Sequence, residues 1–209
     1  MGAYFLWYYI HMQKIYLLNA NEVKKLDPNF GFGSVLDVKT LNTRKDKDLY
    51  IATRLIENYV LNGREKHISA DGKPYANEGT RYNLSQVGEY ACAIEADEEC
   101  GIDIAKEQEF TEHFKERLFS EKDKISLETN LDILRAWTIK EACVKCVGVG
   151  LKGIFKVNIL SNDKCEIDGR EFYYKSFLFD NYCISVVMDN LIEVDDIIEL
   201  SFEDLFINK

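Results

Sequence analysis

Proline, histidine and basic residues are all scarce in this sequence. Only two prolines and three histidines occur among 209 residues, and no two histidines have the spacing of a shared metal site. Acidic residues outnumber basic ones by 36 to 26, which gives a net charge of −10. Such a surface repels nucleic acid, so a nucleic-acid-binding function is excluded. The hydrophobic content of 46% excludes a disordered chain and predicts a folded protein.

Long apolar runs are absent as well. The most apolar segment, residues 3–10, has eight residues, whereas a membrane-spanning helix needs about 20. A secretory signal would need a basic start and a small-residue cleavage site, and neither is present. We therefore predict a cytoplasmic protein without a membrane partner. Residues 1–11 are interpreted as an N-terminal extension, with Met12 as an alternative start.

The cysteines allow two interpretations. Among the six, Cys143 and Cys146 have the C-x-x-C spacing of a redox pair or of half a zinc site. They lie inside a helical pattern, however, and no second pair of this kind accompanies them. We expect six buried, reduced thiols.

Apolar periodicity predicts two long helices, at residues 46–61 and 131–147, each followed by a glycine. Shorter helices are expected at residues 21–26 and 110–119, and a loop at residues 62–81. Strand patterns occur at residues 14–19, 82–84, 90–95, 101–105, 155–160, 171–178, 182–188 and 197–202. Each half of the chain thus has a long helix followed by several strands. We predict an α+β fold with two pseudo-symmetric halves, residues 12–100 and 101–209, each a long helix on a small, mostly antiparallel sheet.

One candidate site residue lies in the strand pattern Gly101-Ile102-Asp103-Ile104. Strand alternation places Ile102 and Ile104 on one face and Asp103 on the other. A carboxylate with little water around it favours a metal or another charged partner. A solvent-facing strand aspartate is the alternative.

Three more candidates share one stripe of the second long helix. Trp137, Glu141 and Lys145 have the spacing i, i+4 and i+8. Glu141 and Lys145 could instead form an exposed salt bridge, worth about 0.2–0.5 kcal/mol. A tryptophan on the same stripe argues against that alternative, because large aromatic side chains usually face the core.

The motifs in this order resemble those of the Sfp-type 4′-phosphopantetheinyl transferases, over residues 71–151. The family's motifs are G-K-P, N-x-S-H, G-[IV]-D-[IV]-E and [WF]-[ST]-x-K-E-[SA]-x-x-K. In this chain they read Gly72-Lys73-Pro74, Asn83-Leu84-Ser85-Gln86, Gly101-Ile102-Asp103-Ile104-Ala105 and Trp137-Thr138-Ile139-Lys140-Glu141-Ala142-Cys143-Val144-Lys145.

The resemblance implies an Mg²⁺-dependent enzyme with its active site between the two halves. It would transfer phosphopantetheine from coenzyme A to a serine of an apo acyl or peptidyl carrier protein and release 3′,5′-ADP. Asp103 and Glu141 would bind Mg²⁺, Glu141 would accept the serine proton, and Lys145 would pair with the diphosphate. The other coenzyme A contacts implied by the resemblance are Lys73, Ser85 and Gln86. We expect a monomer.

Two departures from the family pattern weaken the implied site. Gln86 replaces a histidine and cannot add positive charge, so we expect weaker coenzyme A binding. Ala105 replaces a glutamate on the Asp103 face, so we expect looser Mg²⁺ binding.

These departures leave a second hypothesis open: a degenerate homologue that binds coenzyme A or a carrier protein without turnover. A third hypothesis is a non-catalytic structural module. Because the chain and carrier proteins are both acidic, carrier recognition would need a local apolar or basic patch. Residues 110–131 are the best candidate for that patch.

Overall fold

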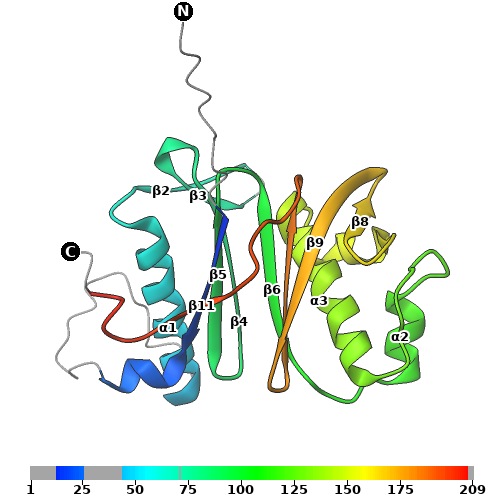
Figure 1. Cartoon of the computed structure of the whole chain (residues 1–209), viewed down its shortest axis with the longest axis horizontal. Helices are drawn as coiled ribbons and strands as arrows, with labels where there is room; N and C mark the ends of the chain where they lie inside the picture. The colour runs from blue at the N-terminus through cyan, green and yellow to red at the C-terminus, as the bar shows by residue number, and fades with distance from the viewer. Residues whose placement is uncertain (1–12, 26–43, 71, 207–209) are drawn as a thin grey trace, which may run out of the picture.

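Two β-sheets lie side by side at the centre of the molecule, and helices cover their outer faces (Figure 1). The computed structural model describes residues 13–25, 44–70 and 72–206. The proposed extension at residues 1–11 lies outside them. None of the described helices is long and apolar enough to cross a membrane.

The first sheet has six strands in the order β11-β1-β5-β4-β3-β2. Their bounds are Gln13–Asn19 (β1), Lys66–Ile68 (β2), Pro74–Ala76 (β3), Arg81–Val87 (β4), Tyr90–Ala96 (β5) and Ile198–Leu200 (β11). Neighbouring strands are antiparallel except for β1 and β11, which are parallel. Helix α1 (Arg44–Leu61) packs on β5, β4 and β1. Short 3-10 helices at Ala20–Lys25 (η1) and Asn77–Gly79 (η4) follow β1 and β3.

The second sheet has five strands in the order β6-β10-β9-β8-β7. Their bounds are Cys100–Lys106 (β6), Val157–Ile159 (β7), Lys164–Ile167 (β8), Arg170–Phe179 (β9) and Tyr182–Met188 (β10). All four pairings are antiparallel. Helix α3 (Asn130–Val147) covers one face of this sheet, while α2 (Glu112–Leu118) and the 3-10 helix η5 (Leu151–Lys156) lie beside it.

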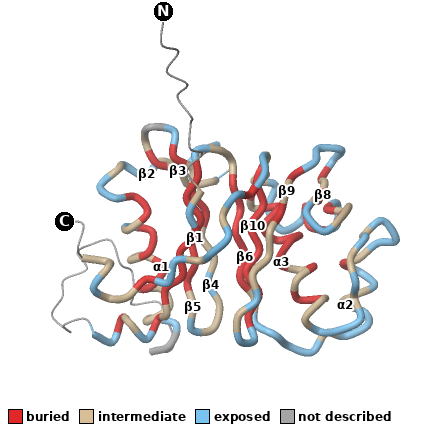
Figure 2. Tube along the Cα trace, viewed as in Figure 1, coloured by how far each residue is buried: buried red, intermediate tan, exposed pale blue. Residues whose placement is uncertain are grey.

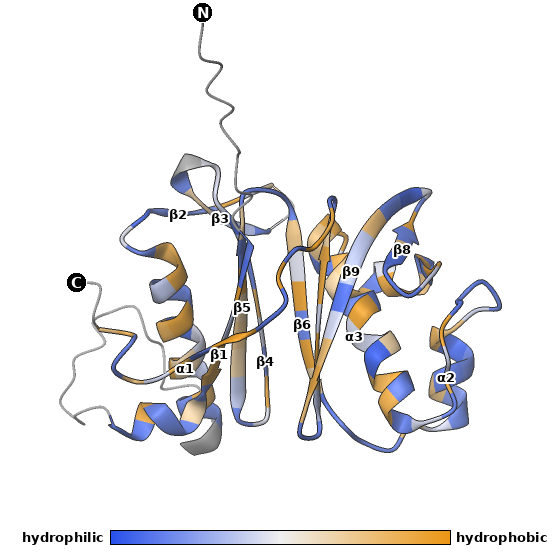
Figure 3. Cartoon of the chain, in the orientation of Figure 1, coloured by the Kyte–Doolittle hydropathy of each residue, from blue (hydrophilic) through white to orange (hydrophobic). Residues whose placement is uncertain are grey.

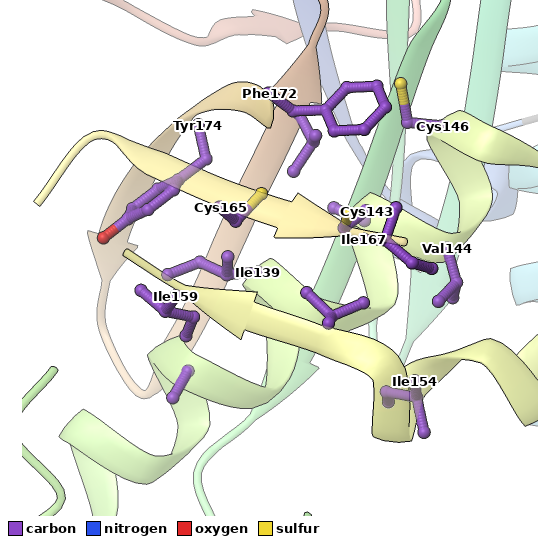
Figure 4. Packing of buried hydrophobic residues seen from close by; sticks show 14 of the residues in the cluster. Ile139, Cys143, Val144, Cys146, Ile154, Ile159, Cys165, Ile167, Phe172 and Tyr174 are labelled. Atoms are coloured by element: carbon purple, nitrogen blue, oxygen red, sulfur yellow. The ribbon is translucent and has the colours of Figure 1, made fainter. Parts of the chain in front are cut away.

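Strand alternation divides the buried side chains among three layers of core. Along β1, Ile15 and Leu17 face the second sheet, whereas Tyr16 and Leu18 face α1. The middle layer, between the sheets, comes from β1, β5, β6 and β10. The third layer joins α3 to β7, β8 and β9 (Figure 4). Buried residues therefore follow the central strands (Figure 2), and the connecting loops are mostly hydrophilic (Figure 3).

The predicted mixture of helices and sheets is confirmed, and so are both long helices. The strand expected at residues 182–188 has the same bounds as β10. The prediction of a loop at residues 62–81 was wrong, because this segment forms β2 and β3. β8 was not predicted either. β2 is a short edge strand that buries no side chain fully, so its backbone pairing leaves no apolar alternation in the sequence.

Candidate active site

Helix α3 lies directly against β6 because Gly101 has no side chain. A Cβ atom at this position would lie 2.0 Å from the carbonyl oxygen of Ala142 and 2.5 Å from the amide nitrogen of Cys146. Those atoms are backbone and cannot move aside without shifting the helix. Asp103 is two residues further along β6, on the same strand face. The close packing therefore brings Asp103 beside the last turns of α3.

Lys145 contacts two other predicted site residues, Asp103 and Ser85. Its Nζ donates to Asp103 Oδ1 at 2.6 Å, to Ser85 Oγ at 2.9 Å and to the carbonyl oxygen of Ile102 at 3.1 Å. Ser85 Oγ in turn donates to Asp103 Oδ1 at 2.9 Å. Side chains from β4, β6 and α3 thus meet in one polar cluster. Asp103 points away from Ile102 and Ile104, as the strand pattern predicted.

Glu141 is buried, and its carboxylate has no hydrogen-bond or ion-pair partner among the described residues. Burial raises the pKa of Glu141 to about 7, with a further contribution from the negative charge of Asp103, while Lys145 acts in the opposite direction. Burial also raises the pKa of Asp103, against the effects of Lys145 and Ser85. The hypothesis of an exposed Glu141–Lys145 salt bridge was therefore wrong, since Lys145 pairs with Asp103 and Glu141 is buried.

A cavity of about 530 Å³ collects most of the predicted site residues. Ser85, Asp103, Glu141 and Lys145 line it, and so does Gln86. Gln86 lies on the α1 side of β4, where its Oε1 accepts a hydrogen bond from the hydroxyl of Thr53. The remaining wall includes Ala105, Glu107 and Trp137.

Lys73 lines a different pocket, of about 370 Å³. Its ammonium group contacts the carboxylate of Glu99 and the carbonyl oxygen of Cys146. Arg81 and Arg170 line the same pocket, and Arg81 also pairs with Glu99 at 2.9 Å. Neither arginine belongs to the predicted site motifs. Arg81 could have been found, because it lies two and four residues before Asn83 and Ser85, on the same face of β4.

Asn83 has a role that the sequence did not reveal. Its Oδ1 accepts a hydrogen bond from the backbone amide of Ile102 at 3.1 Å, so it ties β4 to β6. β6 is at the edge of the second sheet and packs against β4 and β5 of the first. The side-chain bond therefore holds the two sheets in register next to the polar cluster.

Lys140 and Trp137 shape the surroundings of the cluster. Lys140 Nζ is buried and donates to Asp123 Oδ2 at 2.8 Å and to the carbonyl oxygen of Val157 at 2.6 Å. Asp123 Oδ1 also accepts from the amide of Ile159, so this pair fastens the segment between α2 and α3 to β7. Trp137 packs against Phe114 of α2, with ring centroids 5.2 Å apart.

All six cysteines are free and buried, as predicted. Cys143 contacts Cys165 of β8, whereas Cys146 Sγ lies 3.6 Å from the carbonyl oxygen of Glu99. The two members of the C-x-x-C spacing therefore have different neighbours. Across the described parts of the chain, no three His, Cys, Asp or Glu residues are grouped to hold a metal.

The Asp103–Glu141 pair nevertheless fits a hard divalent cation. Mg²⁺ prefers oxygen ligands and commonly combines one or two carboxylates with water and substrate phosphate. Glu141 is 6% exposed, lines the cavity and has no hydrogen-bond or ion-pair partner among the described residues, and burial disfavours the charged form of each acid. A cation between them would relieve both costs.

An α+β protein with two carboxylates and a lysine at one cavity has the residues for metal-assisted phosphoryl chemistry. Residues 99–187 match the family model of the 4′-phosphopantetheinyl transferase superfamily. This match extends from β6 to β10 and includes Asp103, Glu141 and Lys145.

A curated relative, the 4′-phosphopantetheinyl transferase gsp of Aneurinibacillus migulanus, is 28% identical over 86 residues. The aligned segment is 38% of this chain and 36% of the relative, so the match spans about a third of the relative's length. Both matches confirm the resemblance to phosphopantetheinyl transferases that the motifs indicated.

Proposed function

We propose that this protein transfers 4′-phosphopantetheine from coenzyme A to a serine of an apo carrier protein and releases 3′,5′-ADP. The observation that supports this most is the convergence of Asp103, Glu141 and Lys145 on one cavity from β6 and α3. In the reaction, the serine oxygen forms a bond to the β-phosphorus of coenzyme A. The bond from that phosphorus to the oxygen bridging to the α-phosphate breaks, and 3′,5′-ADP departs with the electron pair.

We assign a separate role in this reaction to each of three residues of the cavity. Glu141 accepts the serine proton, for which a pKa raised to about 7 is suitable. Lys145 pairs with the diphosphate and stabilises the charge that develops on it. Asp103 and Glu141 would hold Mg²⁺, which supplies charge neutralisation on the diphosphate. The two acids are thus the residues on which activity depends most.

The coenzyme A contacts follow from the two pockets. Lys73, with Arg81 and Arg170 nearby, offers positive charge for the nucleotide end. Ser85 and Gln86 would contact the 3′-phosphate, with Gln86 held by Thr53. Since Gln86 is neutral where the family has histidine, coenzyme A binding is weaker than in relatives that keep the histidine.

An acyl or peptidyl carrier protein would dock beside the cavity, at the groove between α2, α3 and η5. This groove is lined by Phe114, Leu118 and Phe155, together with Arg117 and Lys152. Apolar side chains with basic neighbours suit an acidic partner, although the whole chain is acidic. The same proposal includes a monomer in the cytoplasm whose halves, residues 12–100 and 101–209, are pseudo-symmetric around the site.

Mass spectrometry tests the proposal directly. An apo carrier protein incubated with this protein, coenzyme A and Mg²⁺ should gain the mass of one phosphopantetheine. Asp103→Ala and Glu141→Ala should each abolish the gain, while Glu171→Ala, an acid-to-alanine change at an exposed site on β9, should not. No gain with fatty-acid, polyketide and peptide carriers would overturn the proposed activity.

Ala105 and Gln86 support a second candidate, a homologue that binds coenzyme A or a carrier protein without turnover. It predicts calorimetric binding of coenzyme A with no product in the mass spectrum. Under this candidate, Ala105→Glu would return the missing acid to the Asp103 face and restore activity. Turnover by the wild-type protein, whatever the effect of Ala105→Glu, would make the second candidate wrong.

A further inference from the structure

Every hydrogen-bond donor of the Lys145 ammonium group is in use. A lysine has three N–H donors, and this one has three acceptors: Asp103 Oδ1 at 2.6 Å, Ser85 Oγ at 2.9 Å and the carbonyl oxygen of Ile102 at 3.1 Å. Lys145 is therefore placed to neutralise Asp103, and it has no donor left for a phosphate unless one of these bonds breaks.

The two acids of the cavity, Asp103 and Glu141, differ in the hydrogen bonds that they accept. Asp103 accepts from both Lys145 and Ser85 through the same oxygen, Oδ1. Glu141 accepts nothing from the residues that the structure describes. A divalent ion that uses both carboxylates would share Asp103 with the ammonium group of Lys145, and the two positive charges repel each other there.

We propose that Lys145 and the divalent cation compete for Asp103, so that the cation binds tightly only when the diphosphate of coenzyme A gives Lys145 another anionic partner. This inference rests on the proposed function, since it takes Asp103 and Glu141 as the ligands and coenzyme A as the substrate. It adds that the binding of the divalent cation and the binding of coenzyme A depend on each other. The separate roles proposed for Asp103, Glu141 and Lys145 do not include this dependence.

The side chain of Lys145 has the freedom that this exchange needs. It is 28% exposed, against 10% for Asp103, and it lines the cavity where the diphosphate would lie. A four-carbon stem lets the ammonium group move while α3 stays against Gly101. The second acid on this face is missing because residue 105 is alanine, so no other carboxylate of β6 helps the cation to displace the lysine.

The linkage is reciprocal. If coenzyme A strengthens metal binding by some factor, the metal strengthens coenzyme A binding by the same factor. The exchange thereby favours loading of metal and coenzyme A together, and disfavours a site that contains the metal alone.

Electron paramagnetic resonance of free Mn²⁺ measures the competition without any turnover. We compare the wild-type protein with Lys145→Met, which keeps an unbranched side chain as far as Cε and removes the charged amino group. The matched control is Lys106→Met: Lys106 lines the same cavity, but its ammonium group lies over the ring of Tyr182, 5.3 Å from the centroid. Each protein is titrated with and without coenzyme A, against a blank of coenzyme A and Mn²⁺ alone.

Without coenzyme A, Lys145→Met should bind Mn²⁺ about tenfold more tightly than wild type, whereas Lys106→Met should change the affinity less than about twofold. Coenzyme A should strengthen Mn²⁺ binding by wild type, and by a smaller factor in Lys145→Met, where only the phosphate ligands contribute. Adding Asp103→Asn to Lys145→Met should remove the gain. Lys145→Gln, tested alongside, gives the same comparison if the methionine variant folds poorly.

Two results would overturn the inference: Mn²⁺ binding by Lys145→Met no tighter than by wild type without coenzyme A, or wild-type binding that coenzyme A leaves unchanged. Neither result depends on a carrier protein. If transfer fails in the mass-spectrometric assay while Lys145→Met still binds Mn²⁺ more tightly, the proposed function is wrong and the competition stands. The reverse pair of results rejects the competition alone.

Discussion

At the scale of single residues, the candidate site contains a carboxylate, that of Glu141, which has no hydrogen-bond or ion-pair partner within the described part of the chain. Glu141 is 6% exposed and lies near Asp103, whose charge Lys145 already compensates. A buried carboxylate in this position is costly in its charged form, which is typical of groups that bind a cation or accept a proton. Its pKa, raised to about 7, is the measurable sign of that cost.

The raised pKa predicts how stability depends on pH. Between the ordinary value of 4.5 and about 7, folded Glu141 keeps a proton that the unfolded chain loses. The free energy of unfolding therefore falls as pH rises through this window. Without divalent cations, we expect the wild-type value to fall by about 2 kcal/mol relative to that of Glu141→Gln between pH 4.5 and 8.

Urea denaturation at several pH values, followed by circular dichroism, measures this difference. Glu128→Gln, at an exposed position before α3, serves as the control and should run parallel to wild type. Parallel curves for wild type and Glu141→Gln would show that Glu141 does not titrate abnormally. Mg²⁺ added above pH 7 should stabilise wild type more than Glu141→Gln.

The sequence could predict those features of the site residues that depend on neighbours along the chain, and it could not predict those that depend on tertiary contacts. The orientation of Asp103 followed from strand alternation alone, because Ile102 and Ile104 had to face the core. The partner of Lys145 could not be predicted from the sequence, because the i, i+4 spacing favours a pair with Glu141 on an isolated helix. Only the approach of β6 to α3 gives the lysine a closer carboxylate, and that approach is a tertiary feature.

At the scale of secondary-structure elements, the contact of α3 with β6 sets the geometry of the site. It depends on Gly101, where any side chain would meet the helix backbone. The capping box at Thr129 and the left-handed Gly148 define the two ends of α3. The position of Glu141 and Lys145 relative to Asp103 is therefore decided where the elements cross.

Gly101→Ala should be far more damaging than its size suggests. We expect a loss of about 3 kcal/mol in the free energy of unfolding, from overpacking against a rigid backbone, and a large loss of Mn²⁺ affinity as α3 moves away. Gly153→Ala is the matched control: its nearest obstacle is a side-chain methyl of Val149, which can rotate. Equal stability of the two variants, measured by chemical denaturation, would contradict this account of the α3–β6 contact.

The helices and strands that bury much apolar surface could be predicted from the sequence, and those that bury little could not. β10 is buried along its whole length, and α1 and α3 each contribute residues to a core layer, so their periodicity was clear. β2 buries none of its three residues, and β8 has four residues with two buried. Such strands exist because a neighbouring strand offers backbone partners, which a single segment of sequence does not show.

At the scale of the whole molecule, the two sheets form one structure with a shared middle core. Ile94 of β5 and Ile102 of β6 are fully buried in that layer, together with side chains of β1 and β10. The C-terminal strand β11 pairs with β1, so the chain returns to the first sheet after it has built the second. Neither sheet can lose its contact with the other without exposing this core to water.

This arrangement predicts that a destabilising substitution in the first sheet also destabilises α3, the helix that covers the second sheet. Ile94→Ala removes a fully buried side chain of the first sheet and should cost about 2–4 kcal/mol. Because the middle core is shared, hydrogen exchange of the α3 amides should accelerate as much as that of the α1 amides. Ile68→Ala, at a position 57% exposed on β2, should change neither. If α1 loses protection while α3 keeps it, the sheets unfold as separate units, and only the contact between β6 and α3 would survive the loss of the first sheet.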